Sequence, residues 1–302
     1  MTHPSQSQAA ATTAPAQSLP RRRSRISALL RDLRQAPFSV WAGLLVLSLY
    51  LVTAVFAPWI APYGEAQVFD LPYADWSAEH LLGTDQVGYD FLSRLIYGAR
   101  NTIGIALLTT ALSFTMGVTL GLISALSKGV VDVFFARLVD IIVSIPSLIF
   151  SLMLLSIVGS NVFTLALIIA TLDSTNFFRL ARTTGMSIVA QDFIEVARLR
   201  GDGLIWIVFR EILPNIMPPL IAEAGLRFSF VFLTISALSF LGVGIQPPTA
   251  DWGSMVRDNA TLITYGIITP LLPAAAIGVL TISVNFVADW FLHKLAGLKN
   301  GH

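Results

Sequence analysis

Hydroxyl and carboxyl side chains inside long apolar runs are the groups whose spacing could serve chemistry in this chain. Two sets have helical spacing, so each predicts a polar stripe on one face of a helix. Lipid cannot satisfy polar groups, so such stripes must face protein or water. Two interpretations stay open: hydroxyls bonding across packed helices, or the lining of a translocation path. The stripes are Asp140, Ser144, Ser147 and Ser151, and Ser229, Ser236 and Ser239, and all six serines are candidates for the path.

Glu223 and Arg227 lie four residues apart in the apolar run that also holds Ser229, and this is the spacing of neighbours on a helix. A lone charge at mid-bilayer costs about 3 kcal/mol or more. The adjacent cation therefore favours a structural ion pair over a proton-coupling carboxylate.

Other chemistry is largely excluded. The chain has no cysteine, and its four histidines lie outside the apolar runs. The sequence contains neither a His-Glu-x-x-His zinc motif nor a Gly-Lys dipeptide, so no Walker-A phosphate loop is present. We therefore predict no catalytic residue, no metal site and no cofactor bound by this chain.

The elements that position these residues are membrane helices. Hydrophobic residues make up 55% of the 302 positions and charged residues 12%, about half the charged share of a soluble domain. Mean hydropathy is +0.73. Six apolar runs approach the ~20 residues needed to cross a bilayer. They lie at about 38–60, 101–126, 134–157, 161–180, 215–243 and 266–292, and Pro146 should kink the third.

The chain is therefore predicted to be an all-α integral membrane protein with six transmembrane helices. With both termini placed inside, fifteen of the 19 Lys and Arg residues are cytoplasmic, which fixes the orientation by the positive-inside rule. The net charge of +1 gives no field for nucleic acid. The predicted parts are a disordered basic arm (1–36), a first span (37–62), an extracytoplasmic segment (63–100), a five-helix core (101–295) with a cytoplasmic loop (181–214), and a cytoplasmic tail (296–302).

Small residues recur every four positions in the second run, at Ser113, Gly117, Gly121 and Ala125. This pattern lets two helix backbones approach closely in lipid, so it predicts helix packing.

The cytoplasmic loop predicts a helical hairpin. A helix-compatible stretch from Gln191 to Arg200 is broken by Gly201-Asp-Gly203, and a second stretch should run from Leu204 and end at Pro214. On the first helix, Phe193, Val196 and Ala197 should share one face. From the residues alone, an interfacial amphipathic helix and a knob that docks on a cytoplasmic partner remain equally open.

The same loop resembles the coupling motif of ABC importer permeases. Phe193-Ile-Glu-Val-Ala-Arg-Leu-Arg-Gly201, nine further residues and Glu211-Ile-Leu-Pro-Asn215 match its spacing, with Val196 in place of the motif's central Ala. His80 to Arg100 and Phe240 to Gly253 resemble the C-type permeases for dipeptides, oligopeptides and nickel. The resemblance runs from about residue 36 to 293.

This resemblance implies a type I importer permease fold with a cytoplasmic coupling helix, in the bacterial inner membrane. It implies a heterodimer with a second homologous permease, two ATP-binding subunits that use ATP and Mg, an extracytoplasmic binding protein, and surrounding lipid. The implied coupling residues are Phe193, Glu195, Val196, Ala197, Arg198, Gly201, Leu213 and Pro214. The implied extracytoplasmic motif residues are Gly83, Thr84, Asp85, Asp90, Pro247, Pro248, Trp252 and Gly253.

Peptides are the default cargo of such permeases, and nickel or another small peptide-like solute is the alternative. An ion-coupled carrier would need an unpaired membrane carboxylate and, usually, two related halves. A membrane enzyme would need a nucleophile with a base or a metal. Neither feature of a carrier is visible, and the absence of cysteine and of histidine in the apolar runs leaves little from which to build an enzyme site.

Overall fold

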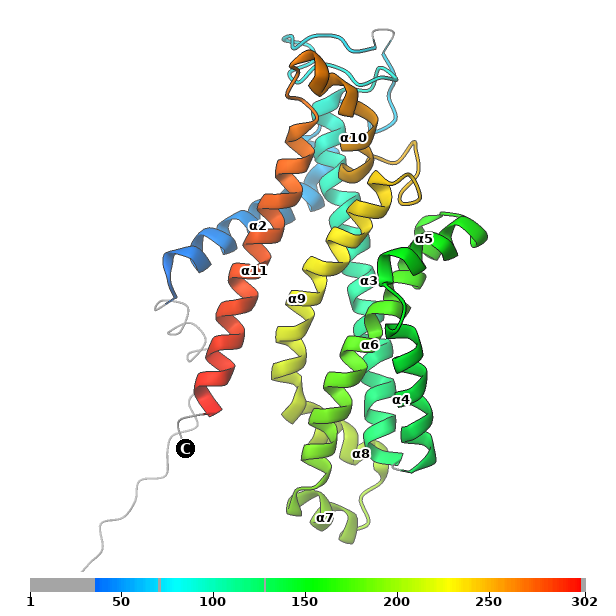
Figure 1. The fold of residues 1–302 in the computed structure, drawn as a ribbon. Helices are drawn as coiled ribbons and strands as arrows, with labels where there is room; N and C mark the ends of the chain where they lie inside the picture. Colours follow the sequence, from blue (N-terminus) through cyan, green and yellow to red (C-terminus); the bar gives the residue numbers. More distant parts are fainter. Residues whose placement is uncertain (1–35, 70–71, 128, 300–302) are drawn as a thin grey trace, which may run out of the picture. The chain divides into compact units, whose positions relative to one another are not determined.

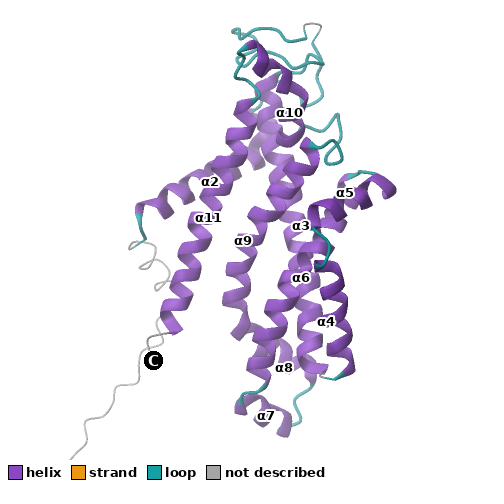
Figure 2. Cartoon of the chain, in the orientation of Figure 1, coloured by secondary structure: helices purple, strands orange, loops and turns teal. Residues whose placement is uncertain are grey.

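The computed structural model describes residues 36–69, 72–127 and 129–299, with side chains to 294. Apart from its last residue, the predicted N-terminal arm lies outside the described residues. The regular elements of the described part are helices (Figures 1 and 2). They are α2 (Phe38–Ile60), α3 (Phe91–Ser127), α4 (Val130–Val143), α5 (Ser147–Val158), α6 (Val162–Val189), α7 (Asp192–Leu199), α8 (Leu204–Ile207), the π-helical turn η1 (Val208–Ile212), α9 (Leu213–Phe240), α10 (Trp252–Asn259), the 3-10 helix η2 (Ala260–Tyr265) and α11 (Leu271–Lys299).

Five helical runs within the described residues are long and apolar enough to cross a membrane: α2, α3, α6, the run from α8 to α9, and α11. A sixth crossing exists if α4 and α5 count together. These findings confirm the predicted all-α membrane fold. α7 lies at one end of the bundle and α10 at the other (Figure 1). We call these the hairpin end and the loop end.

The prediction of one kinked helix over 134–157 was wrong. α4 ends at Val143 and α5 begins at Ser147, with an angle of 87° between them. Pro146 lacks an N–H and disfavours helical geometry at Ile145, so the chain breaks here. The break also divides the first predicted polar stripe, leaving Asp140 on α4 and Ser147 and Ser151 on α5.

Pro214 does not end the helix that contains it, contrary to prediction. The helical run continues from Leu204 to Phe240, and Pro214 is the second residue of α9. The π-helical turn η1 interrupts the usual hydrogen-bond ladder just before it. Proline costs little at the first turn of a helix, where its missing N–H has no partner to lose.

α3 also starts earlier than the apolar run predicted, at Phe91 instead of about residue 101. Its first turn is fixed by Asp90, whose carboxylate accepts hydrogen bonds from the backbone N–H and the hydroxyl of Ser93 at 2.8 and 2.7 Å. Hydropathy alone misses this start because the helix opens with Arg94, Arg100 and Asn101.

The small-residue stripe of α3 packs against α6, as predicted. A Cβ added to Gly117 would lie 2.3 Å from the Ser174 carbonyl oxygen, and one on Gly121 would lie 2.7 Å from that of Phe178. The two backbones therefore approach too closely for any side chain at these positions. Two apolar clusters complete the core. One joins α2, α3, α5, α6, α9, α10 and α11, and the other joins α3, α6, α7, α8, η1 and α9 toward the hairpin end.

A half-buried ion pair ties α4 to α6. The Arg182 guanidinium donates to both carboxylate oxygens of Asp132, at 2.5 and 2.6 Å, and the Ser124 hydroxyl on α3 also donates to Asp132. A second pair between the same two helices, Arg179 with Asp140 at 3.1 Å, has both side chains more than half exposed. Bidentate, partly desolvated pairs are the stronger kind.

Asp132→Asn is therefore expected to lower the free energy of unfolding by about 1–3 kcal/mol, because it leaves Arg182 half-buried without its carboxylate. Asp140→Asn is the matched control and should cost less than about 1 kcal/mol, as exposed pairs do. Thermal unfolding of the detergent-solubilised protein measures both. Equal shifts for the two variants would contradict the assignment of Asp132 as the structural clamp.

Candidate functional site

The hairpin between α6 and α9 is the best-defined candidate site. α7 ends in a Schellman motif: the Asp202 N–H bonds the Ala197 carbonyl at 3.2 Å, and the Gly201 N–H bonds that of Arg198 at 3.0 Å. Gly201 takes φ +84°, the left-handed region that glycine adopts without steric cost. The chain then turns sharply into α8, so the predicted helix–turn–helix is present.

The hairpin has one anchored face and one open face. Ile194, Ala197 and Ile207 are buried in the cluster formed with α3, α6 and α9. Ala197 thus lies on the inward face, not with Phe193 and Val196 as predicted. Both faces of α7 are apolar, so periodicity alone cannot say which one is buried. Large apolar side chains are exposed on the open face: Phe193, Val196, Leu199, Leu204, Ile205, Trp206 and Phe209.

Charges lie among these exposed apolar side chains. Arg200 pairs with Asp202 at 2.8 Å, and its guanidinium lies 5.8 Å from the centre of the Trp206 ring. Glu195 and Arg198 line a shallow cavity along α7. Of the remaining motif residues, Leu213 is partly buried and Pro214 is exposed, both at the start of α9. An apolar patch rimmed by charges is typical of a protein-binding surface.

The motif residues at the loop end form an internal framework. Asp90 also contacts His80 Nδ1 at 2.9 Å, and Asp85 accepts N–H bonds from Val87 and Tyr89. Both carboxylates are buried, as is Thr84. Gly83, at φ +73°, has no room for a side chain, because a Cβ there would lie 2.3 Å from the Ala74 carbonyl oxygen.

The second loop-end motif closes onto α3. Trp252 Nε1 donates to the Leu95 carbonyl at 2.9 Å. The backbone of Gly253 is pressed against Ser236, whose carbonyl oxygen would lie 2.2 Å from an added Cβ. Arg94 donates to the Pro248 carbonyl at 3.2 Å, while Pro247 and Pro248 themselves are exposed. Most of these motif residues therefore bind the loops of the loop end to one another and to the helices below.

Sequence reasoning missed two carboxylates in this framework. Glu65 accepts bonds from the Asn101 amide and the Ala250 N–H, at 2.7 and 2.6 Å. Asp251 caps α10 through the Ser254 N–H and accepts from the Thr102 hydroxyl at 2.9 Å. Burial raises the pKa of the Asp251 carboxyl, and these hydrogen bonds oppose the rise. The partners of Glu65, and Thr102 beside Asp251, are distant in sequence, so no local spacing marks them. Only Asp251 and Ser254 have a local spacing, that of a helix N-cap.

The candidate path serines fall into two groups. Ser147 and Ser151 line a polar cavity with residues of α6 and α9, whereas Ser144 is exposed and donates to the Ile141 carbonyl. Ser229, Ser236 and Ser239 are buried on α9, and Ser239 accepts a bond from the Ile245 N–H. Within the described part of the chain, the hydroxyls of Ser229 and Ser236 have no hydrogen-bond partner.

The predicted pair on α9 is confirmed: Arg227 Nε donates to Glu223 at 2.6 Å. The same guanidinium lies 3.8 Å from the Asp173 carboxylate on α6, a contact that the sequence did not reveal.

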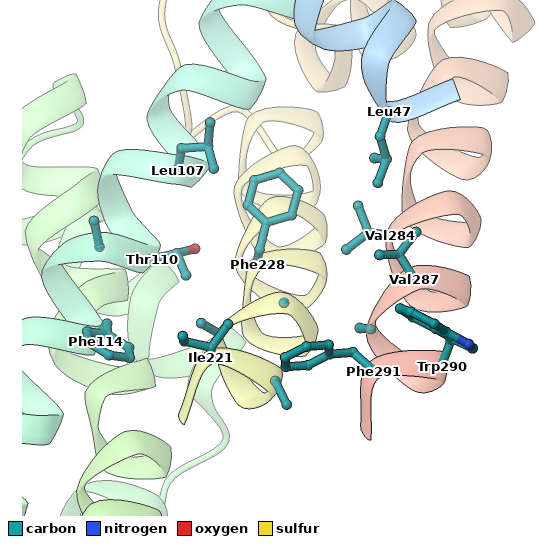
Figure 3. A pocket seen from close by; sticks show the side chains of 15 residues that line it. Leu47, Leu107, Thr110, Phe114, Ile221, Phe228, Val284, Val287, Trp290 and Phe291 are labelled. Atoms are coloured by element: carbon teal, nitrogen blue, oxygen red, sulfur yellow. The ribbon is translucent and has the colours of Figure 1, made fainter. Parts of the chain in front are cut away.

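A larger groove of about 700 Å³ separates α2 and α11 from α3 and α9. Figure 3 shows Leu47, Leu107, Phe228 and Val284 directed into it. Thr110 is its only hydroxyl-bearing residue, and its hydroxyl is already bonded to the Ala106 carbonyl. Such a lining suits hydrocarbon and offers nothing to the charges of a polar solute.

Comparison with known proteins decides the family. Residues 117–297 match the family described as binding-protein-dependent transport system inner membrane component. The chain belongs to this family of ABC permeases. Residues 29–79 also match the N-terminal transmembrane domain of oligopeptide transport permease C.

Similar permeases carry peptide names. The di/tripeptide transport system permease protein of Pseudomonas aeruginosa is 36% identical over 82% of this chain and 84% of its own length. The dipeptide transport system permease proteins of Escherichia coli and Haemophilus influenzae are 39% and 31% identical over 82% of this chain, covering 85% and 86% of their lengths.

Membership defines the chain's part in the system. This ABC permease is a multi-pass inner-membrane transport subunit without a catalytic domain. It works with an ATPase, a binding protein and a partner permease, and ATP is used by the partner ATPases. The exposed hairpin and the polar cavity are thus features of a transport subunit.

Proposed function

We propose that this permease forms half of the translocation path of an ATP-driven importer for di- and oligopeptides. It pairs with a second homologous permease as a heterodimer, above two ATP-binding subunits and below an extracytoplasmic binding protein. The observation that carries the cargo assignment is the similarity to dipeptide permeases across 82% of the chain. A match of that length must include the hairpin, which lies in the middle of the chain.

The hairpin end is the cytoplasmic end in this proposal. Arg198, Arg200 and Arg210 lie on the hairpin, and the positive-inside rule places such clusters in the cytoplasm. Both termini then lie on the same side. The loop end, with its internally hydrogen-bonded loops, faces the binding protein.

The hairpin couples ATP hydrolysis to transport. The exposed side chains of Phe193 and Val196 enter a groove of the ATPase, where Glu195 and Arg198 make polar contacts. Ala197 anchors the hairpin from behind, and Gly201 permits the turn. Leu213 and Pro214 join it to α9, so ATPase closure tilts that helix as part of a rigid-body movement.

The six serines stay proposed as lining of the path between the permeases. Ser147 and Ser151 have the strongest support because they border a polar cavity. Ser144 is exposed on the break between α4 and α5. Ser229, Ser236 and Ser239 are buried within this chain, so they would reach the path only after α9 moves.

The test is uptake by the complete complex in proteoliposomes, with labelled alanyl-alanine, hexa-alanine and nickel supplied in parallel. We expect ATP-dependent uptake of the peptides that requires the binding protein. The matched control omits the binding protein and should give background uptake. Import of nickel alone would overturn the peptide assignment.

A further inference from the structure

A small cavity of about 150 Å³ lies among α5, α6 and α9. Its polar lining is unusual for such a place, since α6 and the α8–α9 run are both candidate spans. Ionisable groups inside membrane helices are costly, and they commonly mark substrate pathways. The polar residues of the lining are Ser147, Ser151, Asp173, Asn176, Arg227 and Thr234.

Two carboxyl groups share one guanidinium at this cavity. Arg227 gives its close hydrogen bond to Glu223, at 2.6 Å, and stands 3.8 Å from Asp173, beyond hydrogen-bonding distance. Asp173 instead accepts from the Ser113 hydroxyl at 2.9 Å and, more weakly, from the Asn176 amide at 3.4 Å. With both carboxyls ionised, the cluster carries one more negative than positive charge, and Asp173 faces the cavity. A cation there would balance it.

The hydroxyls of the lining offer acceptors. Ser151 donates its single hydrogen to the Ser147 carbonyl, and Thr234 donates its own to the Phe230 carbonyl, each at 2.8 Å. Toward a bound group their oxygens can therefore only accept. A primary ammonium has three N–H donors and no acceptor, so it matches this lining.

The volume also suits such a group. The cavity, at about 150 Å³, has room for several water molecules. It therefore admits an ammonium group and its attached carbon. A divalent metal ion is a poorer match, because Asp173 is the only carboxylate among the lining residues.

We propose that this cavity receives the primary ammonium group at the amino terminus of the transported peptide. Asp173 is its counter-ion, and the oxygens of Ser151 and Thr234 accept its hydrogen bonds. The identity of the peptide rests on the proposed function, whereas the preference for an ammonium group is a property of the cavity itself.

The absence of cysteine from this chain allows a direct test. Ser147→Cys puts a thiol at the exposed rim of the cavity in the full complex, with cysteine-free partner subunits. Its modification by 2-aminoethyl methanethiosulfonate, a cation, is compared with that by the anionic 2-sulfonatoethyl reagent. We expect Asp173→Asn to lower the cation-to-anion rate ratio by about tenfold, or about 1.4 kcal/mol. Asp173→Glu, which keeps the charge, should restore the ratio.

Ser144→Cys is the matched control, because Ser144 is also exposed but does not line the cavity. Its rate ratio should not respond to Asp173→Asn. An unchanged ratio at Ser147→Cys, or an equal fall at Ser144→Cys, would overturn the proposal.

Peptides then identify the source of the ammonium. Alanyl-alanine should slow the cationic modification at Ser147→Cys, whereas propionyl-alanine, which lacks only the amine, should not. Acetyl-lysyl-alanine carries its ammonium on a side chain and should also fail to protect. Protection by either analogue as strong as that by alanyl-alanine overturns the assignment to the amino terminus. Absent uptake of alanyl-alanine by the wild-type complex would overturn the cargo proposal while leaving the rate ratio unchanged.

Discussion

Gly201→Asp is expected to abolish peptide import while leaving the protein folded and inserted. A Cβ at Gly201 meets no atom of this chain within 4 Å, so the chain itself has room for the new side chain. The left-handed backbone costs a non-glycine residue about 1–2 kcal/mol, and Asp tolerates it better than most. Any large effect must therefore arise where the hairpin meets its partner. Uptake by the reconstituted importer should fall at least about tenfold, which corresponds to about 1.4 kcal/mol.

Gly203→Asp is the matched control for this variant. Gly203 lies in the same exposed turn and also has open space around its Cβ, but its φ is −67°, which any residue adopts. The same charge is added without altering the Schellman turn, so most uptake should remain. Both variants should co-purify with their partner subunits. Import at the wild-type rate by Gly201→Asp would contradict the coupling role.

The continuity of the chain explains how a change at the hairpin could reach the membrane interior. Ile194 and Ala197 hold α7 in the cluster that includes α9, and the helical run from Leu204 extends to Phe240. Arg227 and Thr234, which line the polar cavity, lie on that same run. The run that packs against α7, and so against the proposed ATPase contact, therefore also forms a wall of the cavity.

The sequence predicted features whose residues lie close together in the chain. The hairpin motif spans Phe193 to Pro214, and Glu223 and Arg227 are one helical turn apart, so spacing alone identifies both. The four-residue spacing of small residues through Gly117 likewise predicts a close helix crossing. Each of these predictions needs only the geometry of one helix or one turn.

The features that were missed depend on pairs of distant elements. Asp132 with Arg182 and Asp173 with Arg227 join different helices, and an isolated carboxylate has no spacing that names its partner. The 87° break at Pro146 was expected only as a kink, because proline fixes where a helix breaks while packing sets the angle. Tertiary contacts determine these features, so they cannot be predicted from one sequence without its fold.

Gly117→Ala is expected to destabilise the protein, against the usual direction of a glycine-to-alanine change in a helix. The added Cβ would lie 2.3 Å from the Ser174 carbonyl oxygen and 2.5 Å from the Phe177 Cβ. Neither contact can be relieved by rotating a side chain, so α3 and α6 must separate. Overpacking of this kind costs about 1–3 kcal/mol. The loss should appear as a lower unfolding temperature of the detergent-solubilised protein.

Gly104→Ala is the matched control in the same helix, and its effect on stability should have the opposite sign. Nothing lies within 4 Å of a Cβ at Gly104, so the substitution removes only the flexibility of glycine and should stabilise α3 by up to about 1 kcal/mol. The two variants share one chemical change, one helix and one candidate span. A difference between them can come only from the contact of Gly117 with α6. Equal stability of the two variants would show that α3 and α6 do not pack as closely as this crossing requires.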